Sequence, residues 1–310
     1  MGEAPAGAGY VMPSVEHEPF VRSDDYGERG LQKQNVLERA RLFVARVTIM
    51  PLKFCVSVSL VICFYLVCLA FPKDSVVNRV AFSVLSRTIL FVIGFYYIKV
   101  ERYGEMKAEK SGGVVSNHVG WTDILILAWL FSPSFVSREA TRNTPIVGKI
   151  SVCLDNIFVD RDKGGGGLAN KLQDRMKQTH EQKSRPVAIF AEGTTTNGKY
   201  VLPFRSGAFL AGVPVTLVII EYKSGRVSPA WESIGGVRHI VLMLSEVQHN
   251  ATVKIINFTP KKGESPQEAA ERARQMMINH SALAPSSSTF KDKLQYHKML
   301  LEQGDHNKKL

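Results

Sequence analysis

An uncharged apolar run of eighteen residues, Phe54 to Phe71, marks the first predicted element of the chain. An α-helix needs roughly 17–25 apolar residues to cross the hydrocarbon core of a bilayer, so this run is just long enough to span one. A second apolar stretch, Val80 to Ile98, follows after a short connection that contains Pro72 and Asn78. The first run begins too far from the start of the chain to be an ordinary secretory signal peptide. The pattern therefore predicts a membrane-associated helical hairpin.

The position of Arg87 leaves the depth of this hairpin open. Arg87 lies near the middle of the second stretch, where a guanidinium group that faces lipid is costly. Either both helices span the bilayer and Arg87 finds a partner, or the hairpin is re-entrant or interfacial and Arg87 lies near the headgroups. A third interpretation is a hairpin buried inside a soluble protein. The segment Lys33 to Lys53 is rich in lysine and arginine, which predicts that this side of the membrane is cytosolic. Both membrane interpretations return the chain to the cytosol before Glu101.

From Gly112 onward, short β-rich runs alternate with helical stretches. The expected strands cover residues 113–117, 134–138, 156–160, 186–192, 213–222 and 251–258. The expected helices lie near residues 121–131, 165–182 and 265–283. The last helix begins with a capping box formed by Ser265 and Glu268. Alternation of this kind is typical of an α/β fold with a central, mostly parallel sheet flanked by helices.

Composition divides the chain into four segments. Residues 1–35 are rich in glycine, proline and mixed charge and are interpreted as a flexible tail. Residues 36–99 hold the basic flank and the helical hairpin, and residues 100–262 form the α/β domain. Residues 263–310 contain a C-terminal helix and a polar tail.

Charge narrows the class of partner. The formal net charge of +11 favours an anionic partner, which can be a nucleic acid, a membrane surface or a phosphorylated substrate. The chain has no zinc-finger spacing and no aromatic signature of an RNA-binding domain, so no nucleic-acid partner is expected. Its cysteines, Cys55, Cys63, Cys68 and Cys153, have neither metal-ligand nor disulfide-framework spacing. No metal site is predicted.

The first candidate for chemistry is the segment SNHVGWTD, which contains His118 and Asp123. It falls where a predicted strand ends and a helix begins, the usual place for sites in open α/β sheets. A helix that starts near Trp121 puts Asp123 in its first turn, from where it can fold back toward His118. A carboxylate bonded to one imidazole nitrogen fixes the tautomer and leaves the other nitrogen to accept a proton. The chain shows no serine or cysteine at a recognisable nucleophile turn, so the nucleophile would come from the substrate. A structural histidine beside a helix-capping aspartate is the alternative.

Two further polar segments follow predicted strands. In FVDRDKGGGG, Arg161 and Lys163 precede four glycines whose backbone amides can bind an anion, although the spacing fits neither the dinucleotide nor the P-loop pattern. A solvated flexible loop explains it equally well. In FAEGTTTNGKYVLPFRSGAF, Glu192, Gly193 and Thr194 end a strand, and Arg205 follows closely. Hydroxyl and amide donors near cations suit a phosphate group, and Glu192 can hold an arginine or bind a glycerol hydroxyl. An ordinary polar hairpin loop is the alternative reading here.

Together these segments, with Pro214 in GVPV, resemble the four ordered blocks of the glycerophospholipid acyltransferase family over roughly residues 110–222. The sequence segments FAEGTTTNG and SPAWESIGGVRH are most similar to those of the branch that acylates lysophosphatidylcholine and lysophosphatidylethanolamine. Ala191 stands where the family usually has proline. Members of this branch often carry calcium-binding EF-hands after the catalytic domain, and this chain shows no such loop, which predicts no calcium control.

This resemblance implies a catalytic domain over residues 100–262 and an acyl-CoA-dependent O-acyltransferase. It implies that His118 is the general base, oriented by Asp123. It also implies that five residues bind the lysophospholipid phosphate: Arg161, Glu192, Gly193, Thr194 and Arg205. Acyl-CoA is then a co-substrate, and no cofactor is expected.

Several alternatives stay open. The acceptor can be lysophosphatidic acid or glycerol-3-phosphate instead of a lysophospholipid with a larger headgroup, and the chain can be a non-catalytic membrane-surface binding protein. The expected partners are acyl-CoA, a lysophospholipid and a lipid bilayer. The expected location is the membrane of the endoplasmic reticulum, with the catalytic domain facing the cytosol.

Overall fold

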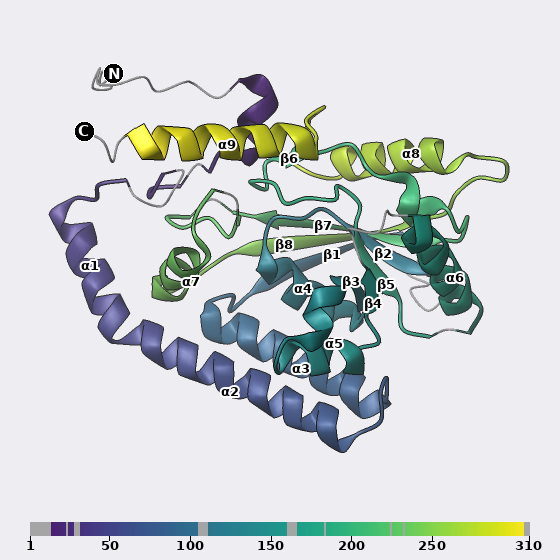
Figure 1. The fold of residues 1–310 in the computed structure, drawn as a ribbon, viewed down its shortest axis with the longest axis horizontal. Coiled ribbons are helices and arrows are strands. Elements are labelled where there is room, and N and C mark those ends of the chain that lie inside the picture. Colours follow the sequence, from purple (N-terminus) through teal and green to yellow (C-terminus); the bar gives the residue numbers. More distant parts are fainter. Residues whose placement is uncertain are drawn as a thin grey trace.

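The structure, a computed structural model, describes residues 14–22, 24–27, 32–104, 111–159, 166–182, 184–223, 225–231 and 233–306. A central sheet is covered by helices on both faces, and a pair of long helices extends along one side of the molecule (Figure 1).

The central sheet has the strand order β1-β8-β7-β2-β5-β3-β4. Its strands are β1 (Ile98–Tyr103), β2 (Gly113–Ser116), β3 (Ser134–Arg138), β4 (Ile157–Val159), β5 (Val187–Phe190), β7 (Val215–Tyr222) and β8 (Ala251–Phe258). Neighbouring strands are parallel except for β7 and β8, which are antiparallel. The predicted α/β fold with a mostly parallel sheet is confirmed. A separate small sheet pairs β6 (Tyr200–Val201) with β9 (Ala284–Pro285).

The described helices occupy segments between and around these strands. They are α1 (Val36–Val47), α2 (Ile49–Ala70), α3 (Val76–Ile93), α4 (Trp121–Phe131), α5 (Val147–Cys153), α6 (Gly166–Gln182), α7 (Gly236–Ser245), α8 (Pro266–Asn279) and α9 (Phe290–His306), with short 3-10 turns at Val15–Phe20, Glu139–Asn143 and Ser206–Phe209. The expected helices correspond to α4, α6 and α8. The sequence did not predict α1, α5, α7 or α9.

The central strands are buried on both faces, which explains why β7 reads as a continuous apolar run. Alternate side chains of β7 point to opposite faces of the sheet. Val218 and Ile220 pack in one core cluster with residues of α3, α4 and α7, whereas Leu217 and Ile219 pack in another with residues of α6 and α8. The two clusters hold the sheet rigidly between helical layers.

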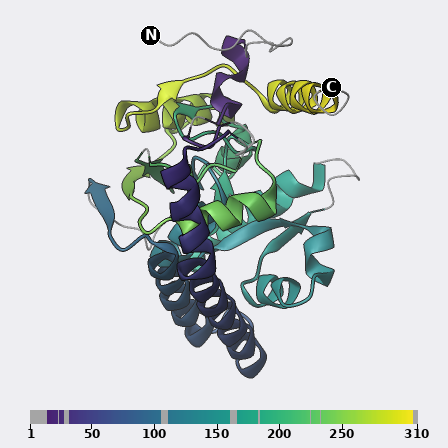
Figure 2. The ribbon, with the colours of Figure 1, turned by 90° about the vertical axis from the view of Figure 1, so that its left-hand side faces the viewer.

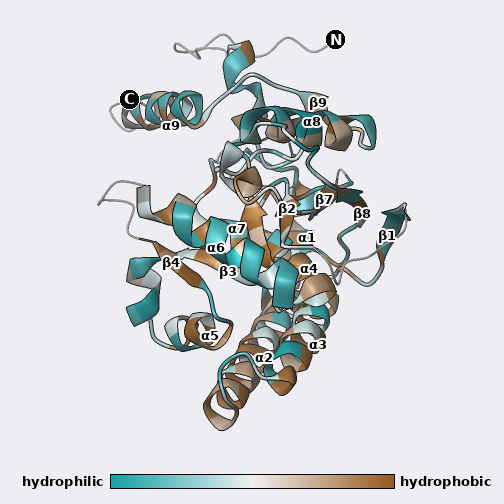
Figure 3. Cartoon of the chain, turned by 90° about the vertical axis from the view of Figure 1, so that its right-hand side faces the viewer, coloured by the Kyte–Doolittle hydropathy of each residue, from teal (hydrophilic) through white to brown (hydrophobic). Residues whose placement is uncertain are grey.

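The α2–α3 pair forms the predicted hairpin, with Phe64 stacked on Phe82 at a centroid distance of 5.2 Å. Both helices are long and apolar enough to cross a membrane. Apolar side chains of α2 such as Leu52 and Leu66 face outward, and the hydropathy colouring shows the apolar character of this pair (Figure 3). A core helix of a soluble protein would bury these side chains. The interpretation as a buried soluble hairpin is therefore wrong, and the exposed surface supports membrane association.

Two cations of the hairpin bind backbone carbonyls. The Arg87 guanidinium donates to the carbonyl oxygens of Phe95 (3.0 Å) and Tyr96 (2.8 Å). Lys53 Nζ donates to the carbonyl oxygens of Ile93 (3.0 Å) and Glu246 (2.5 Å), so it joins α2 to the carboxyl ends of α3 and α7. The charge in the second helix thus has partners, which removes part of the cost of placing it at membrane depth.

Part of the segment interpreted as a flexible tail is packed in the structure. Phe20 is fully buried in a small cluster with Leu202 and Tyr296. The Asn197 side chain donates to the carbonyl oxygens of Glu18 (2.7 Å) and Val21 (3.0 Å). Residues 14–22 are ordered because one aromatic side chain and these hydrogen bonds fix them, features that composition does not reveal.

We expect the folded state to lose stability on acidification. His249 is buried, donates from Nε2 to the Met243 carbonyl oxygen (2.9 Å) and stacks on Phe95. Burial lowers the pKa of His249 to about 4 and that of His239 to about 3. An unfolded histidine binds a proton below a pKa of about 6.5, so between that pH and about 4 the unfolded state takes up protons that the folded state refuses. The thermal midpoint in detergent should therefore fall across this window, and less steeply in His249→Phe. An unchanged slope in that variant would contradict this role for His249.

Candidate active site

The two main candidate segments lie at the same edge of the sheet. β2 and β5 are adjacent and parallel, with Ser116 paired to Phe190, so the residues that follow each strand emerge side by side. His118 comes two residues after β2, and Glu192 comes two residues after β5. The Thr196 amide donates to the His118 carbonyl oxygen at 2.9 Å. The carboxyl edge of parallel strands is where ligands bind in open α/β sheets.

Asp123 lies in the first turn of α4 and reaches back to His118, the arrangement that the spacing predicts. His118 Nδ1 is 2.9 Å from Asp123 Oδ2. The same oxygen accepts hydrogen bonds from the amides of Val119 (2.6 Å) and Gly120 (2.9 Å). The carboxylate is fully buried, whereas the imidazole is partly exposed. Because Nδ1 is bonded to the carboxylate, Nε2 is the nitrogen that can take a proton from a substrate.

The turn that carries His118 is held from a second side. A Cβ atom on Gly120 would lie only 2.4 Å from the Pro229 carbonyl oxygen, so glycine is needed for this close approach. The Trp231 amide donates to the Val119 carbonyl oxygen at 3.1 Å. The turn is therefore fixed between the loop after β5 and the segment that follows β7.

Tyr222, the last residue of β7, is a further hydrogen-bond donor to the Asp123 carboxylate. Its hydroxyl donates to Asp123 Oδ1 at 2.5 Å and lies 2.8 Å from the Thr122 hydroxyl. Burial, and then the charge of Asp123, raise the pKa of Tyr222 well above its ordinary value, so it stays a protonated donor. The sequence did not indicate Tyr222, because it is 99 positions from Asp123 and no local motif marks it.

Phe190, the last residue of β5, fixes the plane of the imidazole. Its ring stacks on that of His118 with centroids 3.8 Å apart and planes 11° from parallel. One face of the imidazole is thereby covered. Aromatic packing and the carboxylate together set the direction in which Nε2 points. A phenylalanine inside an apolar strand gave no signal of this role in the sequence.

The predicted phosphate-binding residues are brought together in part. Gly193 has a positive φ of +71°, and a Cβ there would lie 2.5 Å from Arg205 Nε, so the guanidinium packs directly on the glycine. Glu192 and Thr194 are buried beside it. The Arg205 amide donates to the Ala191 carbonyl oxygen at 2.8 Å, which ties the arginine segment to the strand end.

The structure does not bring the remaining predicted residues into this group. Arg161 lies outside the described residues. Pro214 lies at the amino end of β7, where its carbonyl oxygen accepts from the Gly112 amide (2.9 Å), at the opposite end of β2 from His118. Pro214 therefore lies away from His118 in this fold. Lys293 of α9, which the sequence did not indicate, donates from Nζ to the carbonyl (3.0 Å) and hydroxyl (2.6 Å) oxygens of Thr195.

Comparison with known proteins decides the family. Residues 98–221 match the family described as Acyltransferase. The chain is 33% identical over 341 residues to lysophospholipid acyltransferase LPEAT1 of Arabidopsis thaliana, and the alignment covers 91% of this chain and 86% of that protein. The chain belongs to the acyltransferase family. It is an acyltransferase enzyme, and the resemblance noted in the sequence is confirmed.

Other relatives of this acyltransferase cover less of their own length. Lysophospholipid acyltransferase LPCAT4 of Xenopus tropicalis is 24% identical, with 89% of this chain and 55% of that protein covered. The human LPCAT4 is 30% identical, with 60% and 36% covered. The chain thus spans about half the length of the first of these proteins and about a third of the second. The crystal structure of the lysophosphatidic acid acyltransferase PlsC of Thermotoga maritima superposes with a TM-score of 0.53 at 16% identity, covering 77% of this chain and 95% of that one. This similarity supports the fold.

Proposed function

We propose that this acyltransferase moves a fatty acyl group from acyl-CoA to the free hydroxyl of a lysophospholipid, either lysophosphatidylcholine or lysophosphatidylethanolamine. The observation that carries the proposal is the His118–Asp123 pair, 2.9 Å apart at the carboxyl edge of the sheet and next to the loop after β5. The names of relatives such as LPEAT1 and LPCAT4 support the substrate class.

In the proposed reaction, His118 Nε2 takes the proton of the acceptor hydroxyl as its oxygen attacks the thioester carbonyl. A new C–O bond forms, and the carbonyl oxygen carries the negative charge of a tetrahedral intermediate. Collapse of that intermediate breaks the C–S bond, and the imidazolium returns its proton to the departing CoA sulfur. Asp123 stabilises the imidazolium in between. General-base catalysis of this kind contributes typically about 10²–10⁴-fold.

The surroundings of the pair suit this role. Asp123 accepts hydrogen bonds from two backbone amides and from Tyr222, so its orientation is fixed before a substrate arrives. A positioned carboxylate need not reorganise when the imidazole becomes charged, which lowers the barrier. Phe190 keeps the ring from rotating.

We further propose that the phosphate of the acceptor binds at the loop after β5. The Arg205 guanidinium, packed on Gly193, supplies positive charge, and the Thr194 hydroxyl and loop amides supply donors. Glu192 would orient these groups or accept from a glycerol hydroxyl. Arg161 is proposed as a further cation for this phosphate, from the family resemblance alone.

Release of free CoA from acyl-CoA, measured with a panel of lysophospholipids, lysophosphatidic acid and glycerol-3-phosphate, tests the proposal. We expect the fastest turnover with lysophosphatidylcholine or lysophosphatidylethanolamine. A preference for lysophosphatidic acid or glycerol-3-phosphate would reject the proposed acceptor class, and no release with any acceptor would reject the activity.

We also propose that the enzyme works on the cytosolic face of the endoplasmic reticulum membrane. Protease digestion of sealed microsomes should then cleave the catalytic domain.

Tyr222→Phe should lower kcat about tenfold with little change in KM, because a hydrogen bond to a charged group contributes about 1.5–3 kcal/mol and here acts through Asp123 on the imidazolium. Steady-state kinetics of CoA release measure this. Tyr103→Phe is a matched control, since the Tyr103 hydroxyl donates to Glu101 (2.8 Å) at an exposed strand far from the site. If both variants lost the same activity, or neither did, Tyr222 would have no positioning role.

A further inference from the structure

Helix α1 packs against the protein with Glu38, Arg41 and two buried apolar residues, Leu42 and Ala45, while most of its apolar side chains are exposed. Six apolar side chains of this helix are exposed: Val36, Leu37, Ala40, Phe43, Val44 and Val47. At 3.6 residues per turn they share an arc of roughly 120°, so they form one stripe. Leu37 is 82% exposed and Phe43 is 67% exposed. We call these six residues the α1 stripe.

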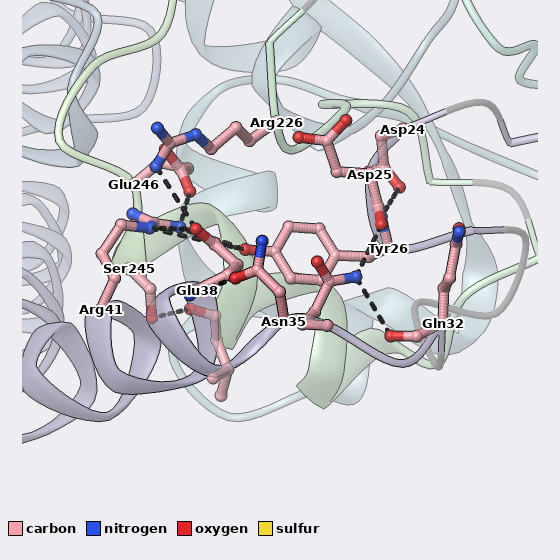
Figure 4. A network of polar contacts seen from close by, with 12 residues as sticks. Asp24, Asp25, Tyr26, Gln32, Asn35, Glu38, Arg41, Arg226, Ser245 and Glu246 are labelled. Carbon is pink, nitrogen blue, oxygen red and sulfur yellow. Dashed lines mark hydrogen bonds and ion pairs between the residues drawn. The ribbon is translucent and has the colours of Figure 1, made fainter.

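The opposite face of α1 is bound to the catalytic domain by charged and polar groups (Figure 4). Glu38 Oε1 accepts hydrogen bonds from the Tyr26 hydroxyl (2.5 Å) and from Arg41 Nη2 (2.7 Å). Arg41 also pairs with Glu246 at 2.5 Å, and Arg226 lies 3.5 Å from Glu38. These bonds to Arg41 are the main reason why the pKa of Glu38 is lowered, which keeps the network charged.

A helix on a water-soluble protein buries its apolar stripe. In α1 only Leu42 and Ala45 are buried, and the larger apolar stripe is exposed. A stripe of this size on the outside marks a surface that is covered in use. Because the charged inner face is tied to the domain, α1 cannot sink into hydrocarbon as a whole, so it suits the plane of a bilayer surface.

Charge and continuity identify the covering surface as lipid. Arg39 and Arg46, seven residues apart, are exposed along one edge of the α1 stripe, and cations at this place are attracted to anionic headgroups. α1 is followed at once by the exposed apolar helix α2, with a bend at Thr48, and the two run down one side of the molecule (Figures 1 and 2). The apolar surface therefore continues from the α1 stripe into the membrane hairpin.

We propose that the α1 stripe is a second membrane contact, which lies in the headgroup region of a bilayer containing anionic lipid and fixes the tilt of the catalytic domain. The same network leads toward the active site. Arg226, which contacts Glu38, is five residues before Trp231, whose amide holds the turn of His118. α1 thereby joins the bilayer surface to the segment that borders the site.

Added tryptophans test the proposal in the full chain reconstituted into vesicles. Phe43→Trp places a probe in the α1 stripe, and Phe290→Trp places one at a partly exposed position on α9 as a matched control. In vesicles of phosphatidylcholine with phosphatidylglycerol, brominated lipids should quench the emission that Phe43→Trp adds over the unsubstituted protein, and acrylamide should quench it little. The emission that Phe290→Trp adds should show the opposite behaviour.

The outcomes separate the possible coverings of the stripe. Quenching of the Phe43→Trp probe by acrylamide but not by brominated lipid would show that the stripe faces water and would overturn the proposal. Quenching by neither would indicate a second copy or another protein on the stripe and would also overturn it. When Arg39→Gln and Arg46→Gln are added to the Phe43→Trp protein, quenching of the Phe43→Trp emission by brominated lipid should fall at least twofold in anionic vesicles. An equal signal in pure phosphatidylcholine would reject the anionic requirement. None of these measurements depends on acyl transfer.

Discussion

Replacing His118 with alanine lowers the rate of acyl transfer by about 10²–10⁴-fold, the usual contribution of a general base, while the protein still folds and binds membranes. The imidazole is the group at the site whose Nε2 can take the acceptor proton, because Nδ1 is bonded to Asp123 at 2.9 Å. Its side chain is partly exposed, so its loss leaves no large cavity. CoA release by purified protein measures the effect.

His280→Ala serves as the control for removing a histidine, since His280 lies beyond α8 and bonds the Met276 carbonyl oxygen at 2.8 Å. It should keep wild-type turnover. If His118→Ala retained more than about a tenth of the rate, general-base catalysis by this residue would be excluded, because one decade is only 1.36 kcal/mol of barrier. A lower melting temperature together with membrane dissociation would point to a structural role.

Asp123→Asn should reduce kcat by about 10²–10⁴-fold, since the amide cannot stabilise the imidazolium and favours the wrong tautomer of His118. The substitution keeps the shape of a side chain that is completely buried and accepts from two backbone amides. The expected loss is therefore in kcat, with KM for acyl-CoA nearly unchanged. Steady-state kinetics over a range of acyl-CoA concentrations separate the two constants.

Circular dichroism and thermal unfolding of Asp123→Asn provide the control. The variant should show the secondary structure of the wild type and a modest drop in melting temperature, because one acceptor oxygen is replaced. A KM that rises tenfold with kcat unchanged would mean that Asp123 serves substrate binding, and the proposed pairing with the base would then fail.

The sequence predicted what depends on neighbours along the chain. The five-residue spacing of His118 and Asp123 across a strand–helix junction is a local relation, and the helix geometry that joins them could be anticipated. The apolar run of β7 and the capping box of α8 are local as well, and both elements form where the pattern placed them. Parallel pairing of β2 with β5 then brings the loop after β5 to His118.

The sequence could not predict contacts that only the fold creates. Tyr222 reaches Asp123 because β7 lies beside β2, and Lys293 reaches Thr195 because α9 folds back across the domain. α1 was missed for a different reason. The sequence analysis treats this segment only as the basic flank of the hairpin. The inward polar contacts of α1 with Glu246 and Arg226 join residues about two hundred positions apart.

The hydrogen bonds from Asn197 to residues 18–21 bear on how the enzyme can be trimmed for experiments. Shortening the chain to remove its glycine- and proline-rich beginning is a natural step in preparing a protein, and a cut after residue 22 would take away the acceptors of the Asn197 side chain and its amide. The same cut would uncover Tyr296 and Leu202, which Phe20 shields. Shortened proteins that begin before Ser14 keep these hydrogen bonds and the packing of Phe20 beside the loop next to His118. Proteins that begin later would have a loosened loop and lower activity.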